Sequence, residues 1–221
     1  PLWSRGLGDV YKRQFLDKLN LVKFEREHLF KCDEFSYEAV VALLSDDGSE
    51  YVTRHETEDE HPNYFVRKVG ELERQPLTEF MDPAKSLREV QKKLITYERA
   101  DGVMLNCMLH LPPGYDLENP LPLPTILWAY PRAYTQGRMA GQVSNSPHRF
   151  STFAGASPRF LALQGYAVLD QVAMPIVGDP EMANDTFTEQ IVANAEAAID
   201  AVVKMGICDQ QRVGVGGHSY G

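Results

Sequence analysis

The sequence predicts an all-β first part followed by a parallel α/β second part. Up to about residue 80, short strands follow one another through turn signals, with no helical spacing of apolar residues between them. From residue 123 onward, apolar strands alternate with helical segments, which is the pattern of a parallel α/β sheet. With 43% hydrophobic residues in 221, the chain has enough apolar content for one or two folded domains.

The first fourteen residues resemble a sequencing artefact more than native protein. The stretch SRGLGDVYKRQ, from Ser4 to Gln14, is similar to the in-frame translation of a transposase adapter, so residues 1–14 are expected to be a non-native leader. The alternative is an ordinary strand and turn. On the first interpretation the natural sequence starts near Phe15, and the chain is a fragment of a longer protein.

Two β-hairpins are predicted between residues 37 and 80. YEAVVALLSDDGSEYVTRHE has Asp47 and Gly48, a common turn pair, between two apolar or alternating runs. NYFVRKVGELERQPLTEF repeats this plan with Gly70 at its turn.

The same region contains a weak internal repeat. FEREHL at residues 24–29 matches LERQPL at residues 72–77 with an offset of 48 residues. This period suits the four-stranded blade of a β-propeller. Two unrelated hairpins in one antiparallel sheet would give the same pattern, so both interpretations remain open at this point.

The pattern changes near Asp82, and we place a domain boundary between residues 15–85 and 86–221. KKLITYERADGVMLNCMLHLPPGYD predicts two strands around the turn at Asp101 and Gly102. LPTILWAYP is a short and almost entirely apolar run, as expected of a strand that is buried on both faces.

Two helices and two strands are predicted after this buried strand. SPRFLALQGY has Pro158 at an early helical position and Gly165 as its stop, and the strand AVLDQVAMP follows. A long helix then begins at the capping pair Thr186 and Glu189 and ends at Gly206. Its apolar stripe comprises Phe187, Ile191, Ala195, Ile199 and Val202. The final strand, RVGVGG, leads into the last residues of the chain.

The last six residues, GGHSYG, match the GxSxG pattern of a nucleophilic serine on a tight turn between a strand and a helix. Gly217 and Gly221 flank Ser219 at the spacing that permits such a turn without side-chain clashes. The pattern alone is weak, but a buried strand after a long helix is the placement that the chemistry requires. His218 is expected to shape the turn, because a neighbour in sequence points elsewhere and cannot act as the base.

A serine nucleophile of this kind also needs hydrogen-bond donors for the oxyanion of its tetrahedral intermediate. The backbone N–H of Tyr220, directly after the serine, is one expected donor. The second should come from the loop after an earlier central strand, here WAYPRAY, which has no HGGG-type run. The hydroxyl of Tyr130 is the candidate, although an aromatic residue at a strand end is more often simply packed.

The charge distribution is uneven. The chain has a formal net charge of −9, which makes nucleic acid an unsuitable partner. Residues 119–169 contain four arginines and no carboxylate. The three cysteines and six histidines show no metal-ligand spacing, so neither a metal site nor a cofactor is expected. No apolar run approaches the roughly 20 residues of a membrane-spanning helix, so we expect no membrane partner.

Several segments together resemble the prolyl oligopeptidase family of serine peptidases, and most closely its glutamyl endopeptidase branch. They are WAYPRAYTQGRMAGQV, SPHRF, LQGYAVLDQVAMPIVGD, NDTF and RVGVGGHSYG. The resemblance covers nearly everything from Phe15 onward and is specific in the second half. It implies the last blades of a β-propeller followed by a truncated α/β-hydrolase domain.

The resemblance implies peptide or unfolded-protein substrates and an acyl-enzyme mechanism. The family's nucleophile falls on Ser219 and its oxyanion tyrosine on Tyr130, whereas its aspartate and histidine lie beyond the end of this chain. Cleavage after glutamate needs fixed donors for a carboxylate, and we expect Arg132 or Arg149 to supply them. The alternative is that these arginines pair with acids of the propeller.

Other functions are compatible with the same motifs. An acyl-peptide hydrolase or an esterase could use this fold, and a non-catalytic relative would lack the downstream histidine. The 221 residues alone are expected to be inactive. The sequence does not fix the oligomeric state or the compartment, although a periplasmic or secreted protein is favoured over a cytoplasmic one if the source is microbial.

Overall fold

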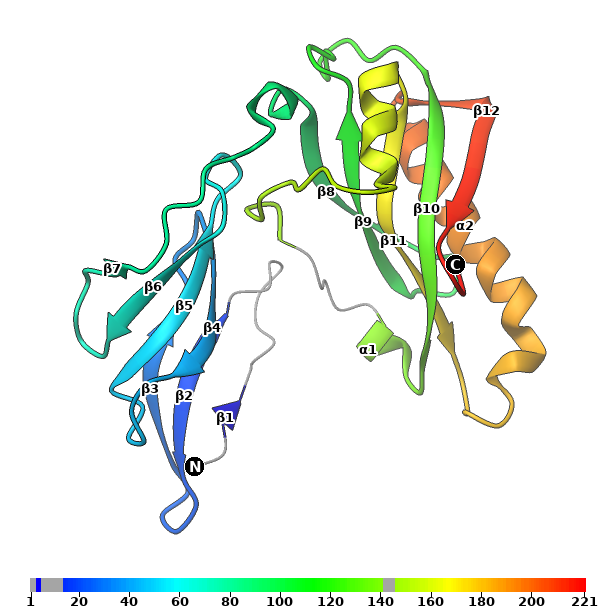
Figure 1. The fold of residues 1–221 in the computed structure, drawn as a ribbon. Helices are drawn as coiled ribbons and strands as arrows, with labels where there is room; N and C mark the ends of the chain where they lie inside the picture. The colour runs from blue at the N-terminus through cyan, green and yellow to red at the C-terminus, as the bar shows by residue number, and fades with distance from the viewer. Residues whose placement is uncertain (1–2, 5–13, 141–145) are drawn as a thin grey trace. The chain divides into compact units, whose positions relative to one another are not determined.

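The structure is a computed structural model that describes residues 3–4, 14–140 and 146–221 (Figure 1). Its contacts divide the chain into two units. The first unit comprises residues 1–85 and 146–152, and the second comprises residues 86–145 and 153–221. Most of the expected leader lies outside the described residues.

The first unit is built from two antiparallel sheets. One has the strand order β1-β2-β3, and the other has the order β4-β5-β6-β7. The strands are β1 (Trp3–Ser4), β2 (Phe15–Asn20), β3 (Glu25–Lys31), β4 (Tyr37–Leu43), β5 (Glu50–Glu56), β6 (Asn63–Lys68) and β7 (Gln75–Pro76). Both predicted hairpins are confirmed, and their turn residues Gly48 and Gly70 have φ angles of 77° and 81°. These left-handed conformations explain why glycine stands at each turn.

The sequence repeat falls on corresponding strands of the two sheets. FEREHL runs through most of β3, and LERQPL contains β7. Each of these strands lies at the end of its sheet in the strand order. The second sheet, with four antiparallel strands, has the strand number of one propeller blade.

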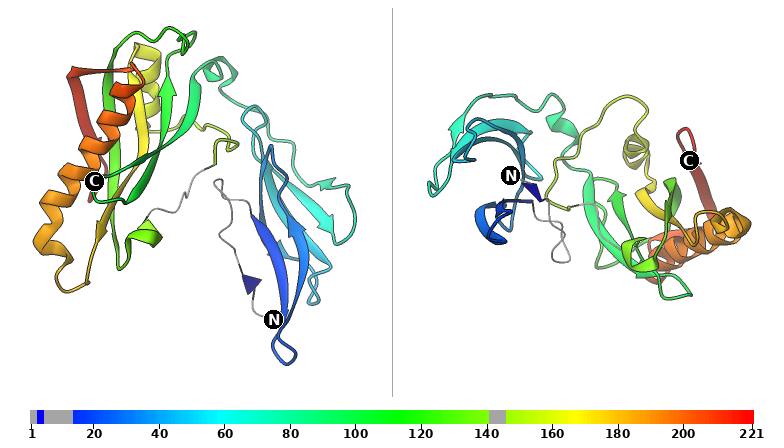
Figure 2. Two further views of the ribbon diagram at one scale, coloured as in Figure 1. Left: turned by 180° about the vertical axis from the view of Figure 1, so that it is seen from behind. Right: turned by 90° about the horizontal axis from the view of Figure 1, so that it is seen from below.

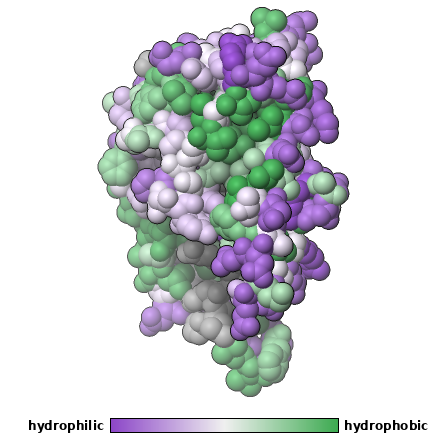
Figure 3. Space-filling model, turned by 90° about the vertical axis from the view of Figure 1, so that its right-hand side faces the viewer, coloured by the Kyte–Doolittle hydropathy of each residue, from purple (hydrophilic) through white to green (hydrophobic). Residues whose placement is uncertain are grey.

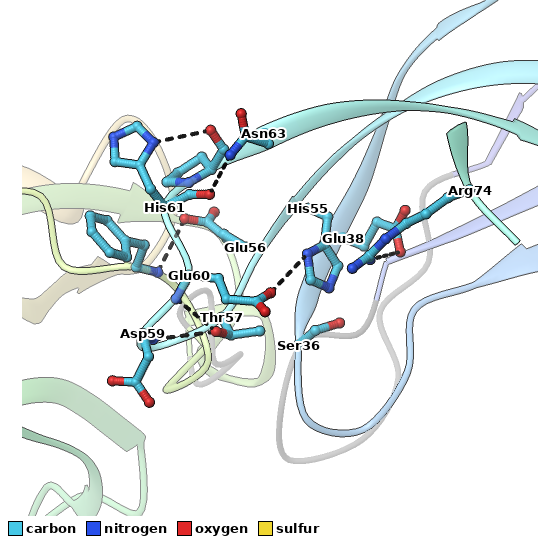
Figure 4. A network of polar contacts seen from close by, with 12 residues as sticks. Ser36, Glu38, His55, Glu56, Thr57, Asp59, Glu60, His61, Asn63 and Arg74 are labelled. Carbon is cyan, nitrogen blue, oxygen red and sulfur yellow. Dashed lines mark hydrogen bonds and ion pairs between the residues drawn. The ribbon is translucent and has the colours of Figure 1, made fainter. Parts of the chain in front are cut away.

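A buried ion pair lies inside the first unit, beside the apolar cluster of Leu16, Phe30, Cys32 and Tyr51. Glu38 accepts two hydrogen bonds from the guanidinium of Arg67, each 2.7 Å long, and a third from the Thr53 hydroxyl at 2.5 Å. The hydrogen bond to Glu38 raises the pKa of Arg67. Figure 4 shows Arg74 reaching the same carboxylate, with 3.8 Å between the charged atoms. Glu38 is therefore buried with donors on both of its oxygens.

Residues 146–152 belong to the first unit, although they lie within the range 86–221 that the sequence predicts for the second domain. Buried Glu56 accepts a hydrogen bond from the Phe150 N–H at 3.1 Å and one from the Arg149 Nε at 3.4 Å. His148 lies 3.8 Å from Glu58. A buried carboxylate needs such donors, and the acid-free stretch supplies them. The spacing of apolar residues, from which the domain boundary was predicted, does not indicate this charge pairing.

The second unit contains a five-stranded sheet with the order β12-β10-β11-β9-β8 (Figures 1 and 2). Its strands are β8 (Gln91–Glu98), β9 (Met104–Leu111), β10 (Leu123–Tyr134), β11 (Ala167–Val177) and β12 (Cys208–Gly217). The central strand β10 runs parallel to both of its neighbours, β11 and β12, whereas β8 and β9 pair antiparallel. The predicted parallel α/β arrangement is therefore confirmed for β10, β11 and β12.

Helices cover both faces of this sheet. Leu169 of β11 packs in the large core with Ala198 and Val202 of α2 (Phe187–Lys204). The adjacent Val168 packs with Ala162 of the helix η2 (Pro158–Gln164). Because successive side chains of a strand point to opposite faces, α2 and η2 lie on opposite sides of the sheet.

Both predicted helices form, but their details differ from the prediction. Residues 158–164 form a 3₁₀ helix, which ends as expected at Gly165 with a φ of 86°. The Thr186 side chain makes no capping hydrogen bond, because the short helix η3 (Ala183–Thr186) runs directly into α2. Its hydroxyl instead accepts a hydrogen bond from the Gln190 side chain at 3.0 Å. The predicted capping box with Glu189 is therefore wrong.

Strand β12 has a free edge in the part of the chain that the structure describes, since its one sheet neighbour there is β10. Val215 in this strand is 72% exposed. Figure 3 shows the side of the molecule where β12 and α2 lie, and apolar residues gather there between hydrophilic ones. No helix in the described ranges is long and apolar enough to cross a membrane.

Candidate active site

The predicted nucleophile lies on a tight turn directly after β12. Ser219 has a φ of 60°, in the left-handed region that a residue with a side chain rarely adopts. The turn is closed by a hydrogen bond of 3.0 Å from the Gly221 N–H to the His218 carbonyl. The Ser219 side chain is exposed. A strained backbone that presents a serine to solvent is the conformation of a nucleophile elbow.

The two flanking glycines leave no room for side chains. A Cβ atom on Gly217 would lie 2.7 Å from the carbonyl oxygen of Ala129, and it would also overlap Gly221. A Cβ atom on Gly221 would overlap the same Ala129 oxygen. The turn is therefore pressed against the central strand β10, and this close approach explains both glycines physically.

The candidate oxyanion residues lie beside each other. Tyr130 follows Ala129 in β10, and its ring centroid is 6.2 Å from that of Tyr220 in an edge-to-face contact. The Tyr220 ring also packs 5.9 Å from Phe187, the first residue of α2. Tyr130 is 48% exposed, so a substrate can reach its hydroxyl. The structure thus brings Tyr130 to the turn that carries Ser219.

The two candidate arginines have different surroundings. Arg132 lies two residues after Tyr130 and lines a cavity in the second unit, and no ion pair to it occurs among the described residues. Arg149 lies in the first unit, where it contacts Glu56 and stacks at 4.7 Å over the ring of Tyr37. The structure therefore leaves Arg132 open to a ligand and gives Arg149 protein partners.

The base for Ser219 is not supplied by the described part of the chain. No hydrogen bond there joins the Ser219 hydroxyl to a histidine or a carboxylate, and His218 is an exposed neighbour on the turn. Among the same residues, no group of three histidine, cysteine or acidic side chains could hold a metal ion. The described residues thus bring an exposed serine and the side chains of Tyr130 and Tyr220 together at this turn.

Sequence reasoning missed two features near Tyr130. Gln171 in β11 has a φ of 53°, and Asn106 in β9 is 3% exposed. Both line the cavity that Arg132 lines. Neither residue belongs to a recognisable motif, and the irregular pairing that places Gln171 depends on contacts between strands.

Known proteins with similar sequences were found, although no family model matches the chain. A probable chloroplastic glutamyl endopeptidase from Oryza sativa subsp. japonica is 38% identical over 217 residues, and one from Arabidopsis thaliana is 37% identical. Each alignment covers 94% of this chain and 23% of the relative. The chain therefore spans about a quarter of the length of these relatives.

Solved structures share the fold at low sequence identity. A dipeptidyl peptidase 4 from Porphyromonas gingivalis has a TM-score of 0.62 and 17% identity, covering 99% of this chain and 32% of its own. The AtxE2 isopeptidase has a TM-score of 0.63 and 16% sequence identity. The match covers 96% of this chain and 31% of the isopeptidase. An acylaminoacyl peptidase from Pyrococcus horikoshii has a TM-score of 0.56 and 13% sequence identity. This match covers 94% of this chain and 30% of the peptidase. The two sequence relatives confirm the resemblance to glutamyl endopeptidases, and the solved structures show a shared fold.

Proposed function

Because the chain is related in sequence to glutamyl endopeptidases of the prolyl oligopeptidase family over almost its whole length, we propose that the complete protein is a serine peptidase. Ser219 is the nucleophile in this proposal. The first unit is the end of a β-propeller, and the second is the beginning of an α/β-hydrolase domain. The substrate is a peptide or an unfolded protein segment.

The proposed reaction proceeds through an acyl-enzyme. The Ser219 hydroxyl gives its proton to a base and attacks the peptide carbonyl carbon, and the carbonyl oxygen becomes an oxyanion. The Tyr220 N–H and the Tyr130 hydroxyl donate hydrogen bonds to this oxyanion. Collapse of the intermediate releases the amine, and water then hydrolyses the ester on Ser219. The base is a histidine oriented by a carboxylate, both from outside the 221 residues.

The strained turn is the observation that carries this proposal. Ser219 has a left-handed backbone between two glycines that tolerate no Cβ atom, and the turn contacts the strand that bears Tyr130. A structural loop has no need for this combination, because an exposed serine gains nothing from backbone strain. A nucleophile does need it, since its hydroxyl must project clear of the turn.

We further propose that cleavage occurs after glutamate. This preference is supported by the printed names of the sequence relatives and by the acid-free stretch around Tyr130. Arg132 is the better candidate for reading the glutamate, because Arg149 already contacts Glu56. Arg132 forms no ion pair with the described residues, so its guanidinium can offer two parallel hydrogen bonds to a carboxylate.

The test compares the complete protein, its Ser219→Ala variant and the 221-residue chain. Blocked peptides with Glu, Gln, Ala or Leu before the scissile bond are the substrates. We expect the complete protein to cleave the Glu peptide fastest, and the variant and the short chain to show no measurable turnover. Cleavage that persists in the variant would contradict the role of Ser219. Hydrolysis of esters or acylated amino acids without any cleavage of the blocked peptides would favour the esterase or acyl-peptide hydrolase alternative.

A further inference from the structure

A small cavity opens in the second unit beside Tyr130. Its volume is about 170 Å³, well below the roughly 300 Å³ at which pockets for drug-sized ligands begin. A cavity of this size suits a single side chain. Tyr130, Arg132 and Tyr134 line it from β10, where alternate residues point to the same face. A substrate whose carbonyl oxygen is bound at Tyr130 can therefore extend a side chain into the cavity.

The cavity exists because β11 leaves its neighbour β9. The two strands pair through Asp170 and Met108, and the pairing ends there. On the other side of β11 the register with β10 shifts, so that two residues of β11, Asp170 and Gln171, lie opposite one residue of β10. This β-bulge contains Gln171, the residue with a φ of 53°. Bulges of this kind re-aim a side chain next to a site.

A buried polar residue also lines the cavity. Asn106 is 3% exposed, and its amide is not among the fully buried side-chain atoms that lack a partner in the described part of the chain. An amide at a cavity wall can both donate and accept hydrogen bonds there. Gln171 adds an exposed amide held in a strained conformation. Backbone strain of this kind is concentrated at functional sites, and two amides at one cavity can supply hydrogen bonds to a ligand.

The chemistry of the lining favours an anion. Arg132 provides a positive charge, and Asn106, Gln171, Tyr130 and Tyr134 provide neutral donors. No described residue that lines the cavity is acidic. The nearby carboxylate of Asp170 is already occupied, since it accepts a hydrogen bond of 2.8 Å from the Nε of Arg159. Nothing in the described lining therefore competes for the guanidinium of Arg132.

We propose that Asn106 and Gln171, together with Arg132, bind the carboxylate of an acidic substrate side chain next to Tyr130. Arg132 supplies the charge, and the two amides complete the hydrogen bonds of the carboxylate oxygens. Asn106 and Gln171 then discriminate a carboxylate from an amide of the same shape. This inference rests on the proposed peptidase function and names the residues that would give it its specificity.

The experiment measures discrimination between two isosteric substrates by the complete protein. Blocked, amidated peptides that differ only in Glu or Gln before the scissile bond are compared by kcat/KM. Gln171→Gly keeps the left-handed backbone and removes the amide, and Asn106→Asp places a negative charge in the cavity. We expect each to lower the Glu-to-Gln ratio about tenfold, and Arg132→Met to lower it at least as much.

Two controls keep the result interpretable. Gln171→Asn tolerates the same backbone and retains an amide, so it should recover part of the lost ratio. Arg138→Met removes an arginine of the same acid-free stretch that does not line the cavity, and the ratio should stay unchanged. An unchanged ratio in the Gln171→Gly and Asn106→Asp proteins would overturn the proposal.

A binding measurement separates this proposal from the proposed function. N-acetylglutamate amide, followed by nuclear magnetic resonance, should bind saturably to the unsubstituted complete protein and about tenfold more weakly to the Arg132→Met variant. Such binding without any peptide turnover would contradict the peptidase function and support the cavity. Turnover without discrimination or binding would support the peptidase function and contradict the cavity.

Discussion

Tyr130 is the residue through which the central strand β10 takes part in the proposed chemistry. Replacing it with Phe keeps the ring contact with Tyr220 and removes the hydroxyl alone. Loss of one oxyanion donor costs roughly 100-fold or more in kcat, so we expect the Tyr130→Phe protein to lose about that factor with a smaller change in KM. Steady-state kinetics of the complete protein measure both quantities.

The matched control for this change is Tyr166→Phe. Tyr166 packs against the apolar cluster on the η2 side of the sheet and has no part in the turn. Its replacement should leave kcat within about twofold. Equal losses in the two variants would mean that the Tyr130 hydroxyl acts on stability and not on the oxyanion.

His110 gives the second unit a pH-dependent stability. Its side chain is 1% exposed, and neither ring nitrogen has a hydrogen-bond partner among the residues that the structure describes. Burial, reinforced by the positive charges of Arg159 and Lys92, lowers the pKa of His110 to about 3. The unfolded chain binds a proton near pH 6.5 and the folded chain does not, so the free energy of unfolding falls as the pH drops from about 6.5 to about 3.

Between about pH 6.5 and pH 3, His110 is expected to lower the free energy of unfolding by up to about 1.4 kcal/mol for each pH unit of acidification. Urea unfolding at pH 7, 6, 5 and 4 can be followed by the helical circular dichroism of α2, which lies in the second unit. The His110→Leu protein should lose less stability on acidification than the unsubstituted protein. Parallel curves for the two proteins would show that His110 is not the titrating group.

At the scale of elements, the contact between the turn after β12 and the strand β10 decides whether Ser219 is presented correctly. Gly217→Ala would place a methyl group 2.7 Å from the Ala129 carbonyl oxygen, so the turn must shift. We expect this variant to fold and to lose at least about 100-fold in kcat/KM, because a displacement of about 1 Å at a catalytic group has such an effect. Circular dichroism of the preparation checks that the variant folds, and steady-state kinetics of the same preparation measure the loss in kcat/KM.

Gly137→Ala is the control at the element scale. Its added methyl group would lie 3.3 Å from a Val103 methyl, which is the end of a side chain that can move. Activity should remain within about twofold of the unsubstituted protein. A large loss at Gly137, or none at Gly217, would contradict the steric explanation of the turn.

An element could be predicted from the sequence where the residues that cause it are close neighbours in the chain. The hairpin turn at Gly48 and the end of η2 at Gly165 depend on a left-handed glycine, which the sequence displays directly. The long helix α2 was visible in its apolar spacing, but its buried Asn194 was not expected. That side chain accepts a hydrogen bond of 2.8 Å from Arg99, 95 residues earlier, and such a partner has no local signal.

The candidate site divides in the same way. Ser219 and its glycines lie within six consecutive residues, and Tyr130 follows a recognisable buried strand, so a sequence pattern could find them. Asn106 and Gln171 reach one cavity only because β9 and β11 part at a bulge. The pairing of Arg149 with Glu56 likewise depends on the docking of residues 146–152 in the first unit. Long-range register and charge pairing cannot be read from short patterns.

At the scale of the whole molecule, each unit has its own core. The first unit is centred on the cluster around Phe30 and Tyr51, and the second on the large cluster between the sheet and α2. Ser219, Tyr130, Arg132 and their cavity all lie in the second unit. One unit with a single core therefore carries the proposed nucleophile, the oxyanion donors and the carboxylate-binding residues.

The most direct test of this interpretation is covalent labelling of the complete protein with a fluorophosphonate, followed by identification of the modified residue by mass spectrometry. These reagents phosphonylate a serine that is activated by a base and an oxyanion hole. We predict modification at Ser219 alone, and none in the Ser219→Ala protein. Modification at another residue, or peptide cleavage by a protein whose Ser219 stays unlabelled, would show that the turn after β12 does not carry the nucleophile.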